Sequence, residues 1–111
     1  MDSEMETTCL TLIAASGTAR SQAFEALKAA KEHNMDEARR LLDASAEAAL
    51  EAHHTQTKLL SEEAAGKHAE FSVLLVHAQD HLMCSMLAQE LIKELVDIYE
   101  LIDNGDVQAS K

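Results

Sequence analysis

Apolar residues recur every three to four positions over three long stretches of the chain, which is the spacing of one face of an α-helix. The pattern predicts helices at about residues 5–32, 35–63 and 72–101. The apolar stripe of the first helix consists of Leu10, Ile13, Gly17, Phe24 and Leu27. That of the second consists of Met35, Ala38, Leu42, Ala49, Ala52 and Leu59.

Short polar breaks separate these stretches. Asn34 follows the first helix, and Glu37 comes three residues later, as in a capping box that starts the second helix. Residues 64–71, with Gly66 and His68, form the second expected connection, and Asn104-Gly105 ends the third helix. The tail to Lys111 is expected to fray. One domain follows, an all-α, up-down-up antiparallel three-helix bundle.

The third predicted helix has more apolar surface than two neighbours can cover. One row contains Leu75, Leu82 and Met86, and a second contains Leu74, Cys84, Ala88 and Leu91 together with His77 and His81. A third row contains Val76, Met83 and Leu87 and passes through Asp80. A helix that is apolar nearly all round is expected to be buried nearly all round. The surplus predicts self-association about a symmetry axis, with the number of subunits left open.

Composition supports helices and narrows the function. The 111 residues include no Pro and only 3% aromatic residues, so strand-forming residues are scarce. Twenty acidic against nine basic residues give a net charge of -11, which disfavours binding to nucleic acid or to an anionic membrane and favours a partner with a basic face. There is no apolar stretch of about 18 residues and no basic N-terminal signal region. Cys9 and Cys84 lie far apart without metal-type spacing, as expected of a reduced, cytoplasmic protein.

His77, Asp80 and His81 form the main candidate site, because positions three and four residues apart share a helical face. They allow three interpretations: hydrogen-bonded core histidines, a transition-metal site completed by His53 and His54, or a histidine that carries a phosphoryl group. In zinc motifs of the H-E-x-x-H type a Glu follows the first histidine, and here Ala78 stands there. A neutral imidazole is a good nucleophile near neutral pH. His81, and Gln79 from a neighbouring subunit, are candidate donors to phosphoryl oxygens. The chain has no phosphate-binding loop or kinase signature, so another protein would have to supply the phosphoryl group.

The run from Val76 to Met83, V-H-A-Q-D-H-L-M, resembles the active-site signature of the lactose/cellobiose-type IIA proteins of the bacterial sugar phosphotransferase system. The segment from Gly17 to Ser21 is similar to that family's G-x-A-R-S, and the segment from Ala52 to Thr57 to its A-H-x-x-Q-T. The likeness extends over about residues 5–100 with the same order of helices.

This resemblance implies a homotrimer, a nine-helix bundle, in which His77 accepts phosphoryl from phospho-HPr. It implies transfer onward to the cysteine of a cognate IIB component, for uptake of a β-linked disaccharide through the membrane component IIC. Such a protein is a phosphotransferase component. The family's axial aspartate corresponds to Asp80, where three copies can bind Mg²⁺ or a similar divalent cation. Which sugar is served is left open.

Two other classes of function compete with this one. Phosphotransfer domains of two-component signalling are helical, but their motif resembles H-x-L-K-G, and neither Lys nor Gly follows His77 in that way. A helical adaptor that oligomerises through the third helix would explain the apolar surplus. It would not explain why His77, Asp80 and His81 lie within that surface.

Overall fold

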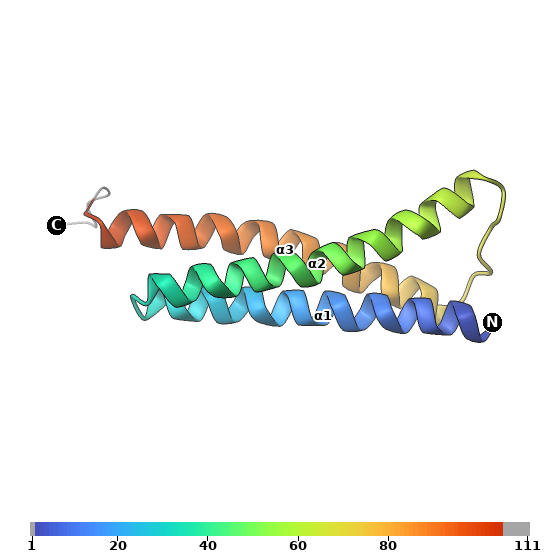
Figure 1. The fold of residues 1–111 in the computed structure, drawn as a ribbon, viewed down its shortest axis with the longest axis horizontal. Coiled ribbons are helices and arrows are strands. Elements are labelled where there is room, and N and C mark those ends of the chain that lie inside the picture. The colour runs from blue at the N-terminus through green and yellow to red at the C-terminus, as the bar shows by residue number, and fades with distance from the viewer. Residues whose placement is uncertain (1, 106–111) are drawn as a thin grey trace.

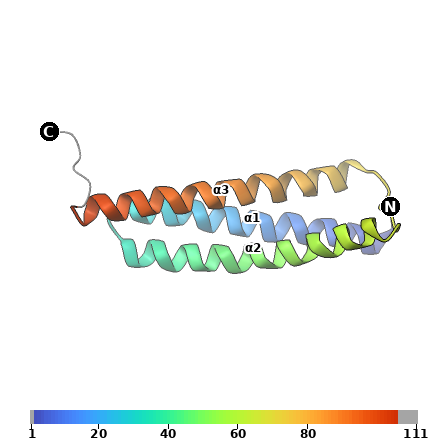
Figure 2. The same ribbon diagram turned by 90° about the horizontal axis from the view of Figure 1, so that it is seen from above.

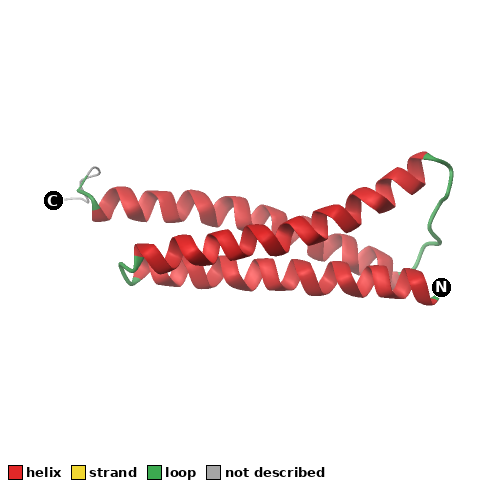
Figure 3. Cartoon of the chain, in the orientation of Figure 1, coloured by secondary structure: helices red, strands yellow, loops and turns green. Residues whose placement is uncertain are grey.

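Three long helices make up the regular structure of residues 2–105, the part of the chain that the computed structural model describes (Figure 3). They are α1 (Ser3–Lys31), α2 (Met35–Ala64) and α3 (Val73–Asp103). The expected bounds differ from these by at most two residues at any end. The expected fraying of the tail concerns residues 106–111, which lie outside the described part.

The helices run up, down and up, which confirms the predicted all-α bundle (Figure 1). They form a rod with extents of 58 × 20 × 20 Å. α1 lies between the other two and packs extensively against both (Figure 2). α2 and α3 lie side by side at the end of the α1–α2 turn and diverge toward the connection at 65–72 (Figure 1). The bundle is therefore closed at one end and open at the other.

Each helix begins with a side chain that caps its free N–H groups. Asp2, Asn34 and Ser72 accept hydrogen bonds from the third residue after each of them. The expected capping box is half formed, because the Glu37 carboxylate pairs with Arg40 of its own helix. At the α1–α2 turn, His33 has a left-handed φ of 64°, and the Asn34 N–H bonds the Ala29 carbonyl. This Schellman arrangement reverses the chain within three residues.

The core surface of α1 is made of small residues. The buried positions Cys9, Leu12, Ser16, Ala19, Ala23, Ala26 and Ala30 alternate in steps of three and four. That repeat of 3.5 residues is the one that keeps a seam facing its partners in left-handed coiled coils. The stripe predicted for this helix was wrong in part: Ile13 and Leu27 pack against the core, but Leu10 is 57% and Phe24 48% exposed. Leu10 and Phe24 lie on a neighbouring face of α1.

Two buried serines fix the register of the helices. Ser45 Oγ of α2 donates to the Ala19 carbonyl at 2.7 Å, and Ser85 Oγ of α3 donates to the Ser16 carbonyl at 2.8 Å. Both bonds run from a short side chain to the backbone of α1, so they require the helices to approach closely. A shift of either helix along α1 would leave a buried hydroxyl without its acceptor.

Ionic contacts join α2 to α3 at the closed end. One terminal nitrogen of Arg39 lies 2.9 Å from Asp97 Oδ1 and 2.8 Å from Glu100 Oε1. His33 Nδ1 lies 2.7 Å from Asp103 Oδ1. No helix within residues 2–105 combines the length and the apolar character needed to cross a bilayer.

Candidate functional site

His77 and His81 lie one turn apart on one side of α3 and contact each other. Their ring centroids are 4.6 Å apart and their planes meet at 63°, an edge-to-face arrangement. His77 is exposed and His81 is half-buried. An exposed imidazole steadied by a neighbouring ring can be reached by a macromolecular partner, which a core histidine cannot. The structure therefore contradicts the core interpretation for His77.

Asp80 lies in the adjoining row of α3, about 60° around the helix from His77. With Val76, Met83 and Leu87 it forms an exposed row, called here the outer row, whose apolar members are 54%, 60% and 58% exposed. The apolar surplus predicted for the third helix is thus present on the surface of the single chain. The Asp80 carboxylate lies 3.5 Å from Cys84 Sγ. Among residues 2–105, Asp80 belongs to no group of three or more His, Cys, Asp or Glu side chains that could hold a metal ion.

The two cysteines differ in exposure: Cys84 is exposed, whereas Cys9 is buried. Asp80 raises the pKa of the Cys84 thiol by accepting its hydrogen bond and by its charge, and Arg20 of α1 opposes this. Both cysteines are free, in keeping with the reduced state that was expected.

Gln79 is directed toward α2 and not toward the histidines. Its carboxamide pairs reciprocally with Gln56 of α2: Gln56 Nε2 donates to Gln79 Oε1 at 2.7 Å, and Gln79 Nε2 donates to Gln56 Oε1 at 2.8 Å. Positions 77 and 79 are about 200° apart around a helix. Gln79 therefore lies on the opposite side of α3 from His77, as expected if it serves a neighbouring subunit.

The candidate residues consequently form three groups and not one pocket. The histidine pair and Asp80 lie in adjoining rows of α3, whereas Gln79 lies on the side of α3 where it bonds Gln56 of α2. His53 and His54 are exposed on α2, and within residues 2–105 no group of three or more His, Cys, Asp or Glu side chains could hold a metal ion. A transition-metal site within one chain thus has no support among the described residues.

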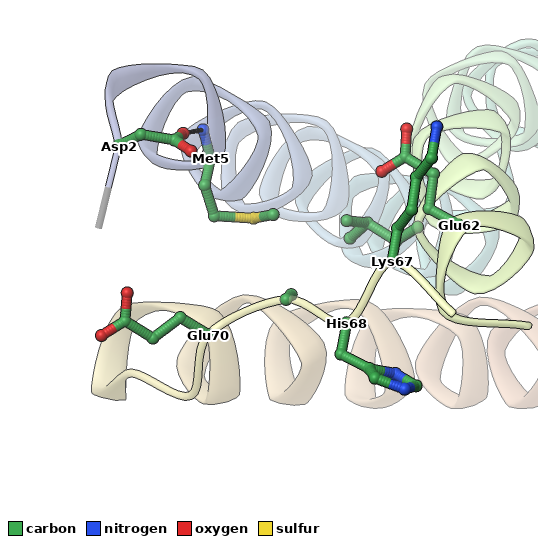
Figure 4. A pocket seen from close by; sticks show the side chains of 8 residues that line it. Asp2, Met5, Glu62, Lys67, His68 and Glu70 are labelled. Carbon is green, nitrogen blue, oxygen red and sulfur yellow. Dashed lines mark hydrogen bonds between the residues drawn. The ribbon is translucent and has the colours of Figure 1, made fainter. Parts of the chain in front are cut away.

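Several cavities lie at the open end of the bundle, including the following two. One, of about 320 Å³, is bounded by Asp2 and Met5 of the α1 end, Glu62 of α2 and residues 67–70 (Figure 4). None of its lining residues was a candidate. The second, of about 270 Å³, is mainly apolar and is called here the Phe71 groove. It is lined by Gln56, Leu59, Leu60, Glu63, Ala69, Phe71, Leu75, Val76 and Gln79.

Sequence reasoning did not assign a role to Gln56 or to the Phe71 groove. Gln56 belonged to the A-H-x-x-Q-T-like segment, and that was the one signal for it. Phe71 was placed in a connection. It is 89% exposed directly before α3, and Val73 at the start of that helix is 87% exposed. Phe71 lines the groove that bears its name, whereas Val73 does not.

The family model and the similar proteins identify the same family. Residues 7–100 match the family model described as the lactose/cellobiose-specific IIA subunit of the phosphotransferase system. The lichenan-specific phosphotransferase enzyme IIA component of Bacillus subtilis is 43% identical over 102 residues, which are 92% of this chain and 93% of that protein.

Solved structures agree. The cellobiose-specific enzyme IIA from Bacillus anthracis superposes with a TM-score of 0.89 at 45% identity, over 94% of this chain and 95% of that one. The IIA(Chitobiose) chain of the solution structure of the IIA(Chitobiose)–HPr complex from Escherichia coli gives a TM-score of 0.77 at 45% identity. That match covers 92% of this chain and 99% of the other.

Proposed function

Because the chain belongs to the lactose/cellobiose-specific IIA family of the sugar phosphotransferase system, whose members are phosphoryl-carrying components, we propose that His77 is its phosphoryl carrier. The observation that supports this residue most directly is its exposed imidazole, packed edge-on against His81 within the run Val76 to Met83. A carrier must present its nucleophile to two different proteins in turn. Exposure at the open end of the bundle suits that requirement.

The chemistry is an exchange of one bond to phosphorus for another. The lone pair of the unprotonated ring nitrogen of His77 forms the new N–P bond, while the bond between phosphorus and the donor's carrier atom breaks and its electron pair stays with the donor. The second ring nitrogen keeps its proton. His81, one turn away, would donate a hydrogen bond to a phosphoryl oxygen. In the next step a cysteine thiolate forms an S–P bond, the N–P bond breaks, and its electron pair returns to the His77 ring nitrogen.

HPr is the proposed donor, and the cysteine of a cognate IIB component is the proposed acceptor. A structural relative has been solved in complex with HPr. The net charge of -11 favours partners with basic faces, which would approach faster through electrostatic steering. Through IIB the phosphoryl group would reach a β-linked disaccharide entering through IIC.

We also propose a homotrimer in which the outer rows of three α3 helices meet at an axis. Covering Val76, Met83 and Leu87 removes apolar surface from water, which is favourable. Asp80 lies in that row, so three carboxylates would face one another. Oxygen ligands of this kind suit Mg²⁺ or a similar hard cation, which Asp80 of each copy would hold. The trimer would also bring Gln79 of one copy toward His77 of the next, since the two lie on opposite sides of α3.

Intact-mass spectrometry tests the carrier role. The protein is mixed at neutral to basic pH with phosphoenolpyruvate, the first enzyme of the system and HPr. We expect one acid-labile phosphoryl group per chain in the wild type and none in His77→Gln. His77 is exposed, so this variant should keep the helical content and stability of the wild type, as circular dichroism would show.

His54→Gln is the matched control, because His54 is an equally exposed histidine on α2. It should take up phosphoryl like the wild type. His81→Ala should take it up more slowly but to the same extent. Stoichiometric uptake by His77→Gln would show that the residue is wrongly assigned, and no uptake by the wild type with competent donors would remove the carrier function altogether.

A further inference from the structure

The reciprocal pair of Gln56 and Gln79 bridges two helices that are otherwise separating. α2 and α3 diverge at this end (Figure 1). The two carboxamides span the gap beside the Phe71 groove with bonds of 2.7 and 2.8 Å. Both side chains are half-buried. At the closed end the same two helices are joined by the charged contacts of Arg39. At the open end, next to the candidate site, a neutral amide pair joins them instead.

Each carboxamide in such a pair keeps hydrogen-bonding groups that the two reciprocal bonds do not use. A carboxamide has two N–H donors and an oxygen with two lone pairs. The reciprocal bonds use one N–H and one lone pair of each residue. Gln79 therefore keeps one N–H in a fixed direction, and its orientation can be reversed only if Gln56 turns at the same time. A glutamine without such a partner rotates freely about its last torsion, whose energy wells are broad.

This matters because the two ends of a carboxamide act oppositely on a phosphoryl group. An N–H donates to a phosphoryl oxygen, whereas the amide oxygen repels it. Donors that are oriented before the reaction stabilise developing charge most effectively, since no reorganisation is needed during transfer. A freely rotating Gln79 would spend part of its time with its amide oxygen, and not an N–H, directed at the phosphoryl group.

We propose that Gln56 is a positioning residue that holds the Gln79 carboxamide with its free N–H directed at the phosphoryl group on His77 of the neighbouring copy. This rests on the proposed carrier function and trimer. Gln56 itself touches neither the phosphoryl group nor His77; it acts through Gln79. Because Gln56 stands on α2 at the rim of the Phe71 groove, it also connects that apolar surface to the reacting group.

A double-mutant cycle in rapid-quench transfer from phospho-HPr tests the proposal. Gln56→Met and Gln79→Met keep the length of the side chain and remove the amide. We expect each to lower the transfer rate constant at saturating donor about tenfold, with the KM for phospho-HPr unchanged. The double variant should be no slower than Gln79→Met, because Gln56 has no route to the reaction except through Gln79.

Gln89→Met is the matched control, because Gln89 is a half-buried glutamine about 15 Å further along α3 by the helical rise. It should transfer at the wild-type rate. A Gln56→Met protein with the wild-type rate, or effects of Gln56→Met and Gln79→Met that multiply in the double variant, would overturn the proposal while leaving the carrier function intact. Failure of the wild type to accept phosphoryl would instead refute the carrier function.

If Gln56→Met does not fold or assemble, the wild type provides a second measurement. The two side-chain amide protons of Gln79 are resolved by NMR before and after phosphorylation of His77. We expect the proton facing the phosphoryl group to shift and the one bonded to Gln56 to stay in place. If both shift equally or neither moves, Gln56 does not hold the amide in this way.

Discussion

Alanine and serine, with few larger residues, fill most of the surface by which α1 meets the other helices. Ala19, Ala23, Ala26 and Ala30 are each fully buried, and the carbonyls of Ala19 and Ser16 accept bonds from serines on the facing helices. Helix axes must lie close for such short side chains to make contact. The fit leaves little room for extra methylene groups.

Enlarging one of these alanines should therefore weaken the fold. Ala19→Leu places three extra carbons beside the carbonyl that Ser45 bonds, and we expect a loss of about 1–3 kcal/mol in unfolding free energy. Ala14→Leu, on the exposed side of the same helix, should change stability by less than about 0.5 kcal/mol. Urea titration of both at one protein concentration compares them. An Ala19→Leu protein as stable as Ala14→Leu would show that the interface is loosely packed.

The size of these residues also explains where sequence reasoning failed. Two large apolar residues of the stripe predicted for α1, Leu10 and Phe24, are half exposed. Hydrophobicity alone favours the largest residues as core, while close helix packing selects the smallest. Periodicity found the helices and their ends, because caps and turns are local. It could not choose between two apolar faces of one helix.

At the scale of the helices, ion pairs of Arg39 join α2 to α3 at the closed end of the bundle. Glu100 and Asp97 hold the pKa of Arg39 above its ordinary value, and Arg39 holds the pKa of Asp97 below its ordinary value. These side chains are about 36–41% exposed, so solvent screens the attraction. The contacts are nevertheless between helices, unlike the Arg40–Glu37 pair within α2.

Arg39→Met should lower stability modestly and in a pH-dependent way. We expect a loss of about 0.5–1 kcal/mol at neutral pH. A carboxylate with a lowered folded-state pKa stabilises above its unfolded pKa of about 3.9 and loses that effect as pH falls through the folded value. The difference from the wild type should thus be constant between pH 5 and 7 and shrink below about pH 4. Urea unfolding at a series of pH values measures it.

Arg40→Met serves as the comparison, since its partner is on its own helix. It should cost less than Arg39→Met at neutral pH. If the difference in unfolding free energy between Arg39→Met and the wild type is the same at pH 3 as at neutral pH, the charge of Asp97 is not involved.

Local patterns revealed only part of the site. His77 and His81 are four residues apart, so their contact follows from helical spacing. Gln56 and Gln79 are 23 residues apart on different helices, and no periodicity connects them. Their pairing depends on how far α2 turns away from α3, which is a property of the packed bundle.

At the scale of the whole molecule, Asp80 in an apolar row predicts how assembly responds to metal. Carboxylates about 4 Å apart repel by about 4 kcal/mol per pair at an effective dielectric of 20, and a divalent cation or protonation removes this cost. We expect the proposed wild-type trimer to weaken in a chelator at neutral pH, and an Asp80→Leu trimer to persist there. Sedimentation velocity with and without the chelator compares them.

Glu51→Leu removes an exposed charge on α2 and controls for the change in net charge. It should respond to the chelator as the wild type does. Monomeric Asp80→Leu beside a trimeric wild type would show that Asp80 does not lie at the axis.

The contacts between α2 and α3 differ at the two ends of the bundle, and this difference also determines where local opening occurs first. Ionic contacts and the short turn restrain residues 35–45, whereas beyond the point of divergence α2 is supported mainly by α1. The free energy of local opening should fall along α2 toward residue 64, so that its amide hydrogens exchange with solvent faster there than near Arg39. Faster exchange at residues 35–45 would contradict this gradient. We therefore expect the stiffest part of the chain to lie away from His77, and the end proposed to receive other proteins to open most easily.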